Sequence, residues 1–321
     1  MSPLITLRVP ATSANLGSGF DTIGMAVSLY NIFKVTELLP EGEYKIEAHG
    51  EGARELSDPA ANLVIKAYED TCRRWGVKGP GFSMWCHNII PLCRGLGSSA
   101  GAVVAGVLIA KYLTSHTDDE AELLRAMTLI EGHPDNVAPC YLGGMVVSCW
   151  DGENLRYVNL PALPPEVLCV VAVPDEQVKT SDARKALPKQ VPFEDAVFNL
   201  GRAALLTAAW ATGKWDYLKW GMDDRLHQQY RSKLFSGGEA IFSSVQKIPE
   251  CISVAISGSG PSVIALVNGA TQKVAEAMCR TFTEHGVRSQ FFVLDGSAQG
   301  AKVDIDMGLE DEIAKVRGLN K

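Results

Sequence analysis

The chain has 321 residues, of which 46% are hydrophobic and 21% charged, a composition typical of a globular protein with one large or two medium domains. With 30 Lys and Arg against 37 Asp and Glu, the formal net charge is −7, so the chain as a whole is not expected to bind nucleic acid or an anionic membrane surface. The longest apolar stretch, residues 100–110, is shorter than the about 18 residues that a membrane-spanning helix needs.

In chain order, the first half mixes strand and helix patterns. Apolar or alternating runs predict strands, and a period of 3.6 residues predicts helices. Asp118 or Asp119, followed by Glu122, resembles an N-terminal helix cap with acidic residues in the first turn. We expect strands at 5–9, 32–38, 44–49, 82–86, 145–150 and 155–160, and helices at 63–75, 99–113, 119–131 and 135–141.

A proline cluster at residues 161–165 separates the two halves, because proline neither continues a helix nor donates to a sheet. We place a domain boundary there, which gives units of residues 1–160 and 161–321. After the cluster the patterns predict strands at 168–173, 252–256, 262–267 and 289–294, and helices at 193–211 and 272–285. This β-α-β-β-α-β order is the ferredoxin-like arrangement, here with a helical insertion, so the predicted fold class is α+β. The pattern of the polar tail from Gly296 indicates no particular function.

Neither the N-terminus nor the cysteines indicate export. Residues 1–8 hold no basic segment that leads into an apolar one, which argues against a secretory signal. The eight cysteines never occur at Cys-x-x-Cys spacing, which argues against a zinc knuckle or a dithiol redox site. We therefore expect reduced cysteines in a cytoplasmic protein.

The most informative segment lies between the predicted strand 82–86 and the predicted helix 99–113. Its glycines let the backbone approach an anion, and its two serines stand at a helix N-terminus, where free N–H groups favour phosphate. Both the Walker pattern with its lysine and the Gly-x-Gly-x-x-Gly spacing are absent, which excludes a P-loop or Rossmann nucleotide site. The alternative is close packing of a buried helix. The predicted phosphate-binding loop comprises Pro91, Arg94, Gly95, Leu96, Gly97, Ser98, Ser99, Ala100 and Gly101.

Two further segments are rich in small and hydroxyl residues. Residues 9–21 read Val-Pro-Ala-Thr-Ser-Ala-Asn-Leu-Gly-Ser-Gly-Phe-Asp, and residues 256–262 read Ile-Ser-Gly-Ser-Gly-Pro-Ser. Together with the predicted loop, they resemble the three signature segments of the GHMP kinases. The first segment and Asp-Asn-Val-Ala-Pro at 135–139 are most similar to the homoserine kinases within that superfamily.

The resemblance implies a ribosomal-S5-like N-terminal domain, a ferredoxin-like C-terminal domain and transfer of phosphate from ATP to the hydroxyl of L-homoserine with Mg²⁺. Such a reaction needs cradled phosphates, a divalent metal and an oriented nucleophile. ATP and L-homoserine are therefore the expected small-molecule partners, and a homodimer is left open. The alternatives are a kinase for another small alcohol, such as mevalonate or a sugar, and a non-catalytic ligand-binding protein of the same fold.

The resemblance also assigns residues on the nucleotide side. Ser99 matches a family serine near Mg²⁺, and Glu131 matches the family's metal carboxylate; magnesium takes one or two such oxygens and keeps water. By itself Glu131 would be a solvated acid at a helix end. Asn62 is a candidate for adenine contact, and a helix N-cap is its alternative.

Homoserine carries an ammonium, a carboxylate and a hydroxyl, so its site needs an acid, a guanidinium and a polar orienting group. Asp21 and Asp135 are candidates for the ammonium and Asn15 for the hydroxyl. Arg184 and Arg231 match family arginines at the carboxylate, a task for which the bidentate guanidinium is suited. Asn15 could instead be an ordinary turn residue, and Asp21 a helix cap. The two arginines could instead be surface charges.

Three residues are candidates for the catalytic step, namely Asn15, His133 and Asp135. The resemblance places His133 close to the substrate. Asp135 is interpreted as an orienting group first and a general base second, because direct attack by the hydroxyl, with its proton passing to phosphate, is also considered.

Overall fold

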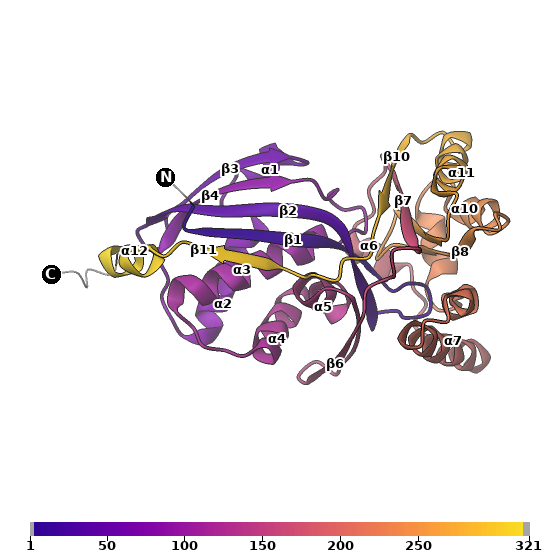
Figure 1. Cartoon of the computed structure of the whole chain (residues 1–321), viewed down its shortest axis with the longest axis horizontal. Coiled ribbons are helices and arrows are strands. Elements are labelled where there is room, and N and C mark those ends of the chain that lie inside the picture. Colours follow the sequence, from indigo (N-terminus) through magenta and orange to yellow (C-terminus); the bar gives the residue numbers. More distant parts are fainter. Residues whose placement is uncertain (1–2, 317–321) are drawn as a thin grey trace.

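The computed structural model describes residues 3–316; residues 1–2 and 317–321, the outer ends of the two predicted units, lie outside the description. The fold is α+β, as predicted, with a seven-stranded and a four-stranded sheet. Figure 1 shows the sheets following one another along the long axis of the molecule. Among the described residues, no helix has the length and apolar character needed to cross a membrane.

The seven-stranded sheet is built on two long antiparallel strands, β1 (Ile5–Ala14) and β2 (Ile23–Leu39). Its order is β11-β1-β2-β4-β3, with β4 at Gly81–Asn88 and β3 at Tyr44–Gly50. The strand β5 (Met145–Trp150) also pairs with β2 and carries β6 (Leu155–Leu160) at its other edge. Both β1 and β2 are longer than predicted. Residues 10–14 of β1 are small, hydroxyl or proline residues, and residues 23–27 of β2 are all buried, so neither part shows an alternating pattern.

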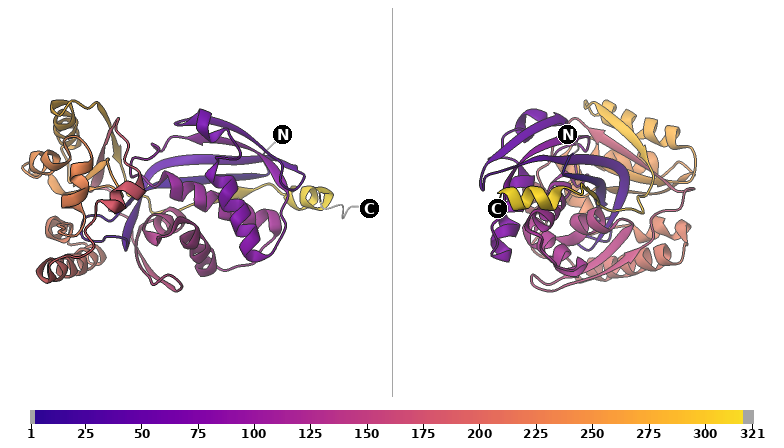
Figure 2. Two further views of the ribbon diagram at one scale, coloured as in Figure 1. Left: turned by 180° about the vertical axis from the view of Figure 1, so that it is seen from behind. Right: turned by 60° about the vertical axis from the view of Figure 1, so that its left-hand side comes forward.

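Helices cover one face of this sheet (Figures 1 and 2). They are α2 (Leu63–Trp75), α3 (Ser98–Thr114), α4 (Glu120–Glu131) and α5 (Pro134–Leu142), whereas the short α1 (Ala53–Leu56) lies beside β3 at the edge of the sheet. The cap predicted for α4 is confirmed, since Asp119 accepts a hydrogen bond from the backbone of Glu122 at 3.0 Å. The helix α3 is apolar on nearly all sides and packs in the core against Ile5, Leu7 and Val9 of β1. Its N-terminus thereby lies at a fixed place above the sheet.

The four-stranded sheet has the order β10-β7-β9-β8 and is antiparallel throughout. Its strands are β7 (Leu168–Pro174), β8 (Cys251–Ile256), β9 (Val263–Val267) and β10 (Ser289–Leu294), and its long helices are α7 (Phe193–Ala211) and α11 (Thr271–Glu284). This confirms the predicted ferredoxin-like order. The insertion contains α8 (Leu218–Gly221), α9 (Gln228–Arg231), α10 (Gly238–Val245) and two 3₁₀ turns, Trp215–Tyr217 and Ser232–Leu234.

The end of the chain differs from the expectation. The strand β11 (Lys302–Ile305) pairs antiparallel with β1, with Ile5 opposite Ile305, so the tail extends the first sheet and not the ferredoxin-like unit. The helix α12 (Leu309–Val316) follows it. The strand was missed because it is four residues long, mostly exposed and half charged, so that only its partner reveals it. The boundary near residue 160 stays a prediction.

Candidate active site

The three segments rich in glycine and serine meet where the two sheets adjoin, and they line one cavity. The side chain of Asn15 donates to the carbonyl of Gly258 at 2.8 Å. The hydroxyl of Ser257 lies 2.9 Å from that of Ser13 and donates to the carbonyl of Gly95 at 2.7 Å. Hydrogen bonds between residues far apart in the sequence therefore hold the three segments together without a ligand.

The predicted phosphate-binding loop connects β4 to the N-terminus of α3. Its backbone takes left-handed conformations at Cys93, Gly95 and Gly97, with φ of 54°, 76° and 69°. A Cβ atom at Gly97 would lie 1.9 Å from the hydroxyl of Thr12, so only glycine fits this turn. Gly97 also leaves the start of α3 without a side-chain cap. The first N–H groups of α3 thus remain available to an anion.

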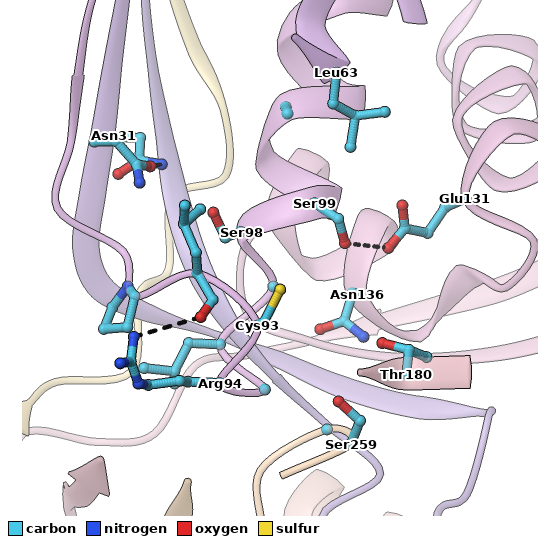
Figure 3. Close-up of a pocket in the computed structure, with 18 of the residues that line it drawn as sticks. Asn31, Leu63, Cys93, Arg94, Ser98, Ser99, Glu131, Asn136, Thr180 and Ser259 are labelled. Atoms are coloured by element: carbon cyan, nitrogen blue, oxygen red, sulfur yellow. Dashed lines mark hydrogen bonds between the residues drawn. The ribbon is translucent and has the colours of Figure 1, made fainter. Parts of the chain in front are cut away.

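Next to this helix start, Ser99 donates a hydrogen bond to Glu131 at the end of α4, with 2.7 Å between the oxygens (Figure 3). Burial raises the pKa of Glu131, although the Ser99 hydroxyl and His133 oppose the shift. Within the described residues, no group of three or more His, Cys, Asp and Glu could hold a metal ion. A hydroxyl and a carboxylate nevertheless fit Mg²⁺, which completes its shell with phosphate oxygens and water.

The helix α5 begins directly after this pair and carries the candidate acid–base residues. The Nδ1 atom of His133 lies 2.5 Å from Oδ1 of the buried Asp135. Burial lowers the pKa of His133, but the hydrogen bond and the charge of Asp135, together with the charge of Glu131, outweigh it and leave that pKa raised. The neighbouring Asn136 accepts a hydrogen bond from Thr12 at 2.8 Å, which ties α5 to β1.

The two predicted arginines come from different elements and face the same cavity. Arg184 lies on α6 (Thr180–Lys185), a helix that was not predicted, and both its terminal nitrogens donate to Asp21 at 2.9 Å. Arg231 on α9 donates to the carbonyl of Gly258 at 3.0 Å, and its buried Nε atom has no hydrogen-bond partner among the residues that the structure describes. Burial lowers the pKa of Arg231 to about 10. A buried guanidinium with an unused donor is suited to an anionic ligand.

Two asparagines that line the cavity adopt the structural roles given above as alternatives. Asn15 has a left-handed backbone, with φ of 71°, and its side chain accepts from the N–H of Asp21 at 3.0 Å. Asn62 caps α2 by accepting from Val64 at 2.9 Å, and it donates to Leu56 at 2.7 Å. Contacts of these two residues with ligands stay predictions.

Arg94 also uses its donors within the protein. Its Nε atom donates to the carbonyl of Pro174, and one terminal nitrogen donates to Glu51, both at 3.0 Å. The side chain therefore attaches the phosphate-binding loop to the end of β7. Figure 3 shows it on the outer side of this loop.

The cavity brings together nearly every residue predicted for the site. Ala100 and Gly101 do not line it; they are buried in the first turn of α3, where the N–H of Gly101 makes an intrahelical bond to Gly97 at 3.0 Å. Sequence reasoning missed six lining residues that Figure 3 labels, namely Asn31, Leu63, Cys93, Asn136, Thr180 and Ser259. Cys93, Asn136 and Ser259 stand inside the glycine- and serine-rich segments or the 135–139 motif, so a signal for these three was present.

The fold and the glycine- and serine-rich loop at residues 91–101 define the class of this protein, the GHMP kinases. A family model described as GHMP kinases N terminal domain matches residues 62–144, a stretch that contains the loop and α5. The chain is 42% identical over 298 residues to the homoserine kinase of Carboxydothermus hydrogenoformans, across 93% of this chain and 96% of that protein. It is also 40% identical over 301 residues to the homoserine kinase of Moorella thermoacetica, a match that covers 94% of this chain and 99% of that protein.

A solved structure agrees with these relatives. The crystal structure of homoserine kinase from Cytophaga hutchinsonii aligns with a TM-score of 0.82 at 30% identity, and covers 94% of this chain and 97% of that one. The chain belongs to the homoserine kinase family.

Proposed function

We propose that this protein transfers the γ-phosphate of ATP to the hydroxyl of L-homoserine and forms O-phospho-L-homoserine. The observation that carries the proposal is one cavity that holds an anion-binding helix start at one side and the buried Arg231, with its unused donor, at the other. The first feature suits a nucleotide phosphate and the second an amino-acid carboxylate.

On the nucleotide side, Ser98, Ser99 and the N–H groups at the start of α3 bind the phosphates, and Asn62 lies toward the adenine. Ser99 and Glu131 would hold Mg²⁺, which when bound neutralises charge on the phosphates. Because Ala100 and Gly101 fix the first turn of α3 in the core, these donors need little reorganisation as charge develops on the transferring group.

On the acceptor side, Arg184 and Arg231 bind the carboxylate of homoserine, and Asp21 and Asp135 bind its ammonium. Arg184 already forms an ion pair with Asp21, so the substrate exchanges that pair for two new ones. Asn15 orients the hydroxyl toward the phosphates. Holding both reactants in one geometry supplies much of the rate increase, since phosphoryl transfer depends mainly on position and charge.

The hydroxyl proton has two routes. In one, Asp135, oriented by its hydrogen bond to His133, accepts the proton as the bond to phosphorus forms. In the other, the proton passes to the transferred phosphate and Asp135 only orients the substrate. An Asp135→Asn variant separates them: general-base catalysis predicts a loss of about 100-fold or more in kcat, and simple orientation predicts a smaller loss.

The proposed function is tested by ADP release with homoserine, threonine, mevalonate and galactose as acceptors. We expect homoserine to be used at least about 100-fold more efficiently than mevalonate or galactose, because these leave buried charged groups without partners. Preference for mevalonate or galactose would identify another small-alcohol kinase. If none of the four acceptors leads to ADP release, the non-catalytic alternative is favoured.

Cytoplasmic location and a homodimer complete the proposal. All eight cysteines are free, which supports a reducing compartment. Phe193, Val197 and Leu200 expose apolar surface along α7, which supports association of two copies. Light scattering during size-exclusion chromatography tests the assembly, and a monomer at micromolar concentration would contradict it.

A further inference from the structure

The ring of Phe20 lies among three groups of the acceptor side. Its centroid is 4.9 Å from the guanidinium carbon of Arg231 and 5.9 Å from that of Arg184. The ring of His227 lies 5.1 Å away at an angle of 31°. Phe20 itself is half-buried and does not line the cavity, so any influence on a ligand passes through the arginines.

His227 is anchored from two directions. Its ring is fully buried, and its Nε2 atom lies 2.7 Å from the carbonyl of Gly17, in the loop that carries Phe20. Its own backbone N–H donates to Asp224 at 2.9 Å, and so does that of Gln228 at 2.8 Å. Since Arg231 follows in the same short helix, this network joins the loop of Phe20 to the helix of Arg231.

Two guanidinium groups near one another repel, and the charge of Arg184 contributes to the lowered pKa of Arg231. An aromatic ring within about 6 Å attracts a guanidinium through its quadrupole and restricts where it lies. The ring of His227 is held neutral, because burial lowers its pKa more than Asp224 and Asp21 raise it, and Arg231 adds to the lowering. The ring of His227 therefore adds no third positive charge beside Arg184 and Arg231.

We infer that Phe20, held by the ring of His227, is a positioning residue that keeps Arg184 and Arg231 in place for the substrate carboxylate. This inference rests on the proposed function. It predicts that the aromatic character of residue 20 determines affinity for the amino acid and leaves the nucleotide site unaffected.

The test replaces Phe20 and measures steady-state kinetics for homoserine and for ATP. Phe20→Leu keeps apolar volume but removes the ring, and we expect the KM for homoserine to rise about 5- to 50-fold, with kcat and the KM for ATP within about twofold. Phe20→Tyr keeps the ring face and should restore the KM to within about threefold of wild type.

Phe198 offers a matched control elsewhere in the chain. Its ring lies 4.4 Å from the guanidinium of Arg202 and 4.0 Å from that of Arg225, yet it does not line the cavity. Phe198→Leu removes an equivalent cation–π arrangement, and we expect the KM for homoserine to stay within twofold of wild type. Thermal melts establish that each variant folds.

His227→Gln gives a second and independent measurement, because glutamine keeps a donor for Gly17 but has no ring. We expect it to raise the KM for homoserine and not the KM for ATP. A folded Phe20→Leu variant with the KM of the Phe198→Leu control, or failure of Phe20→Tyr to restore the KM, would overturn the inference. Absence of homoserine phosphorylation by the wild-type protein would instead overturn the proposed function.

Discussion

Asp21 and Arg184 form a bidentate ion pair, with both N–H···O distances at 2.9 Å, between the turn after β1 and the helix α6. Both side chains are about one-third exposed, at 34% and 38%, and both line the cavity. The pair itself resembles the two charged ends of an amino acid. A ligand with both charges can therefore separate it and leave neither residue without a partner.

The first prediction follows from this exchange of partners. Compared with homoserine, 4-hydroxybutyrate lacks the ammonium and 3-amino-1-propanol lacks the carboxylate. Each would leave one member of the Asp21–Arg184 pair unpaired, so we expect kcat/KM to fall at least about 100-fold for both. The Asp21→Asn variant should show a smaller difference in kcat/KM between homoserine and 4-hydroxybutyrate than the wild type. An unchanged ratio of the two kcat/KM values in that variant would contradict the exchange of partners.

The second prediction concerns the carboxylate contacts. Removal of Arg184 or Arg231 should cost about 2–5 kcal/mol, or tens- to thousands-fold in kcat/KM for homoserine, because a partly buried charge loses its partner. The free-energy cost in the double variant should be smaller than the sum of the costs in the two single variants, since both guanidinium groups hold the same anion. Arginine-to-lysine variants should recover only part of the activity.

The exposed Arg288 is the control for these variants. Arg288→Ala should change kcat/KM by less than about twofold. A titration of ATP binding checks that the nucleotide site survives in each protein. Wild-type kinetics in folded Arg184 or Arg231 variants would mean that the carboxylate binds elsewhere.

The third prediction separates the metal and phosphate contacts from acceptor binding. Ser99→Ala and Glu131→Ala should lower kcat about 100-fold or more while the KM for homoserine stays within about threefold, because their interactions strengthen as charge develops on the transferring group. Glu122→Ala, an exposed acid on the same helix as Glu131, serves as the control. Full activity after both changes would exclude this loop as the phosphate site.

The fourth prediction uses the lowered pKa of His227, a shift that burial causes. Below the usual pKa of about 6.5 the unfolded chain takes up a proton that the folded protein resists, so this histidine stabilises the fold fully above that pH and progressively less below it. The free energy of unfolding in urea should therefore fall more between pH 7.5 and 5.5 for the wild type than for His227→Gln. Parallel pH profiles would show that His227 is not the group responsible.

The fifth prediction concerns the end of the chain. Leu309 and Ile313 of α12 are buried against the core of the first sheet, and Figure 1 shows α12 at the end of the molecule opposite the four-stranded sheet. Leu309→Ala or Ile313→Ala should lower the free energy of unfolding by about 2–4 kcal/mol and leave kcat/KM within twofold. The fully exposed Met307 gives the control, since Met307→Ala should change stability by less than about 0.5 kcal/mol. Loss of activity without loss of stability would argue that the tail reaches the site.

Local pattern was sufficient for much of the fold. The limits of α2, α7, β5, β6 and β10 agree with the periodicity of the sequence residue for residue, because each element presents one regular apolar face or lies between clear stop signals. The glycines and serines before an apolar helix also predicted a phosphate-binding loop, and that role stays a prediction. The resemblance to a family then pointed to polar and charged residues that line the cavity, among them Glu131, Arg184 and Arg231.

The remaining features depend on contacts between segments that are distant in the chain. The strand β11 exists because β1 offers it an edge, and α6 carries Arg184 to Asp21 from 163 residues away. The ring of Phe20 supports the arginines only because His227 arrives behind it from the insertion. Periodicity reports which face of an element is buried, but the choice of partner follows from how the elements pack. The sequence by itself therefore determined most of the elements and the composition of the loop. The tertiary structure decided where β11 and α6 lie and which side chains act on one another.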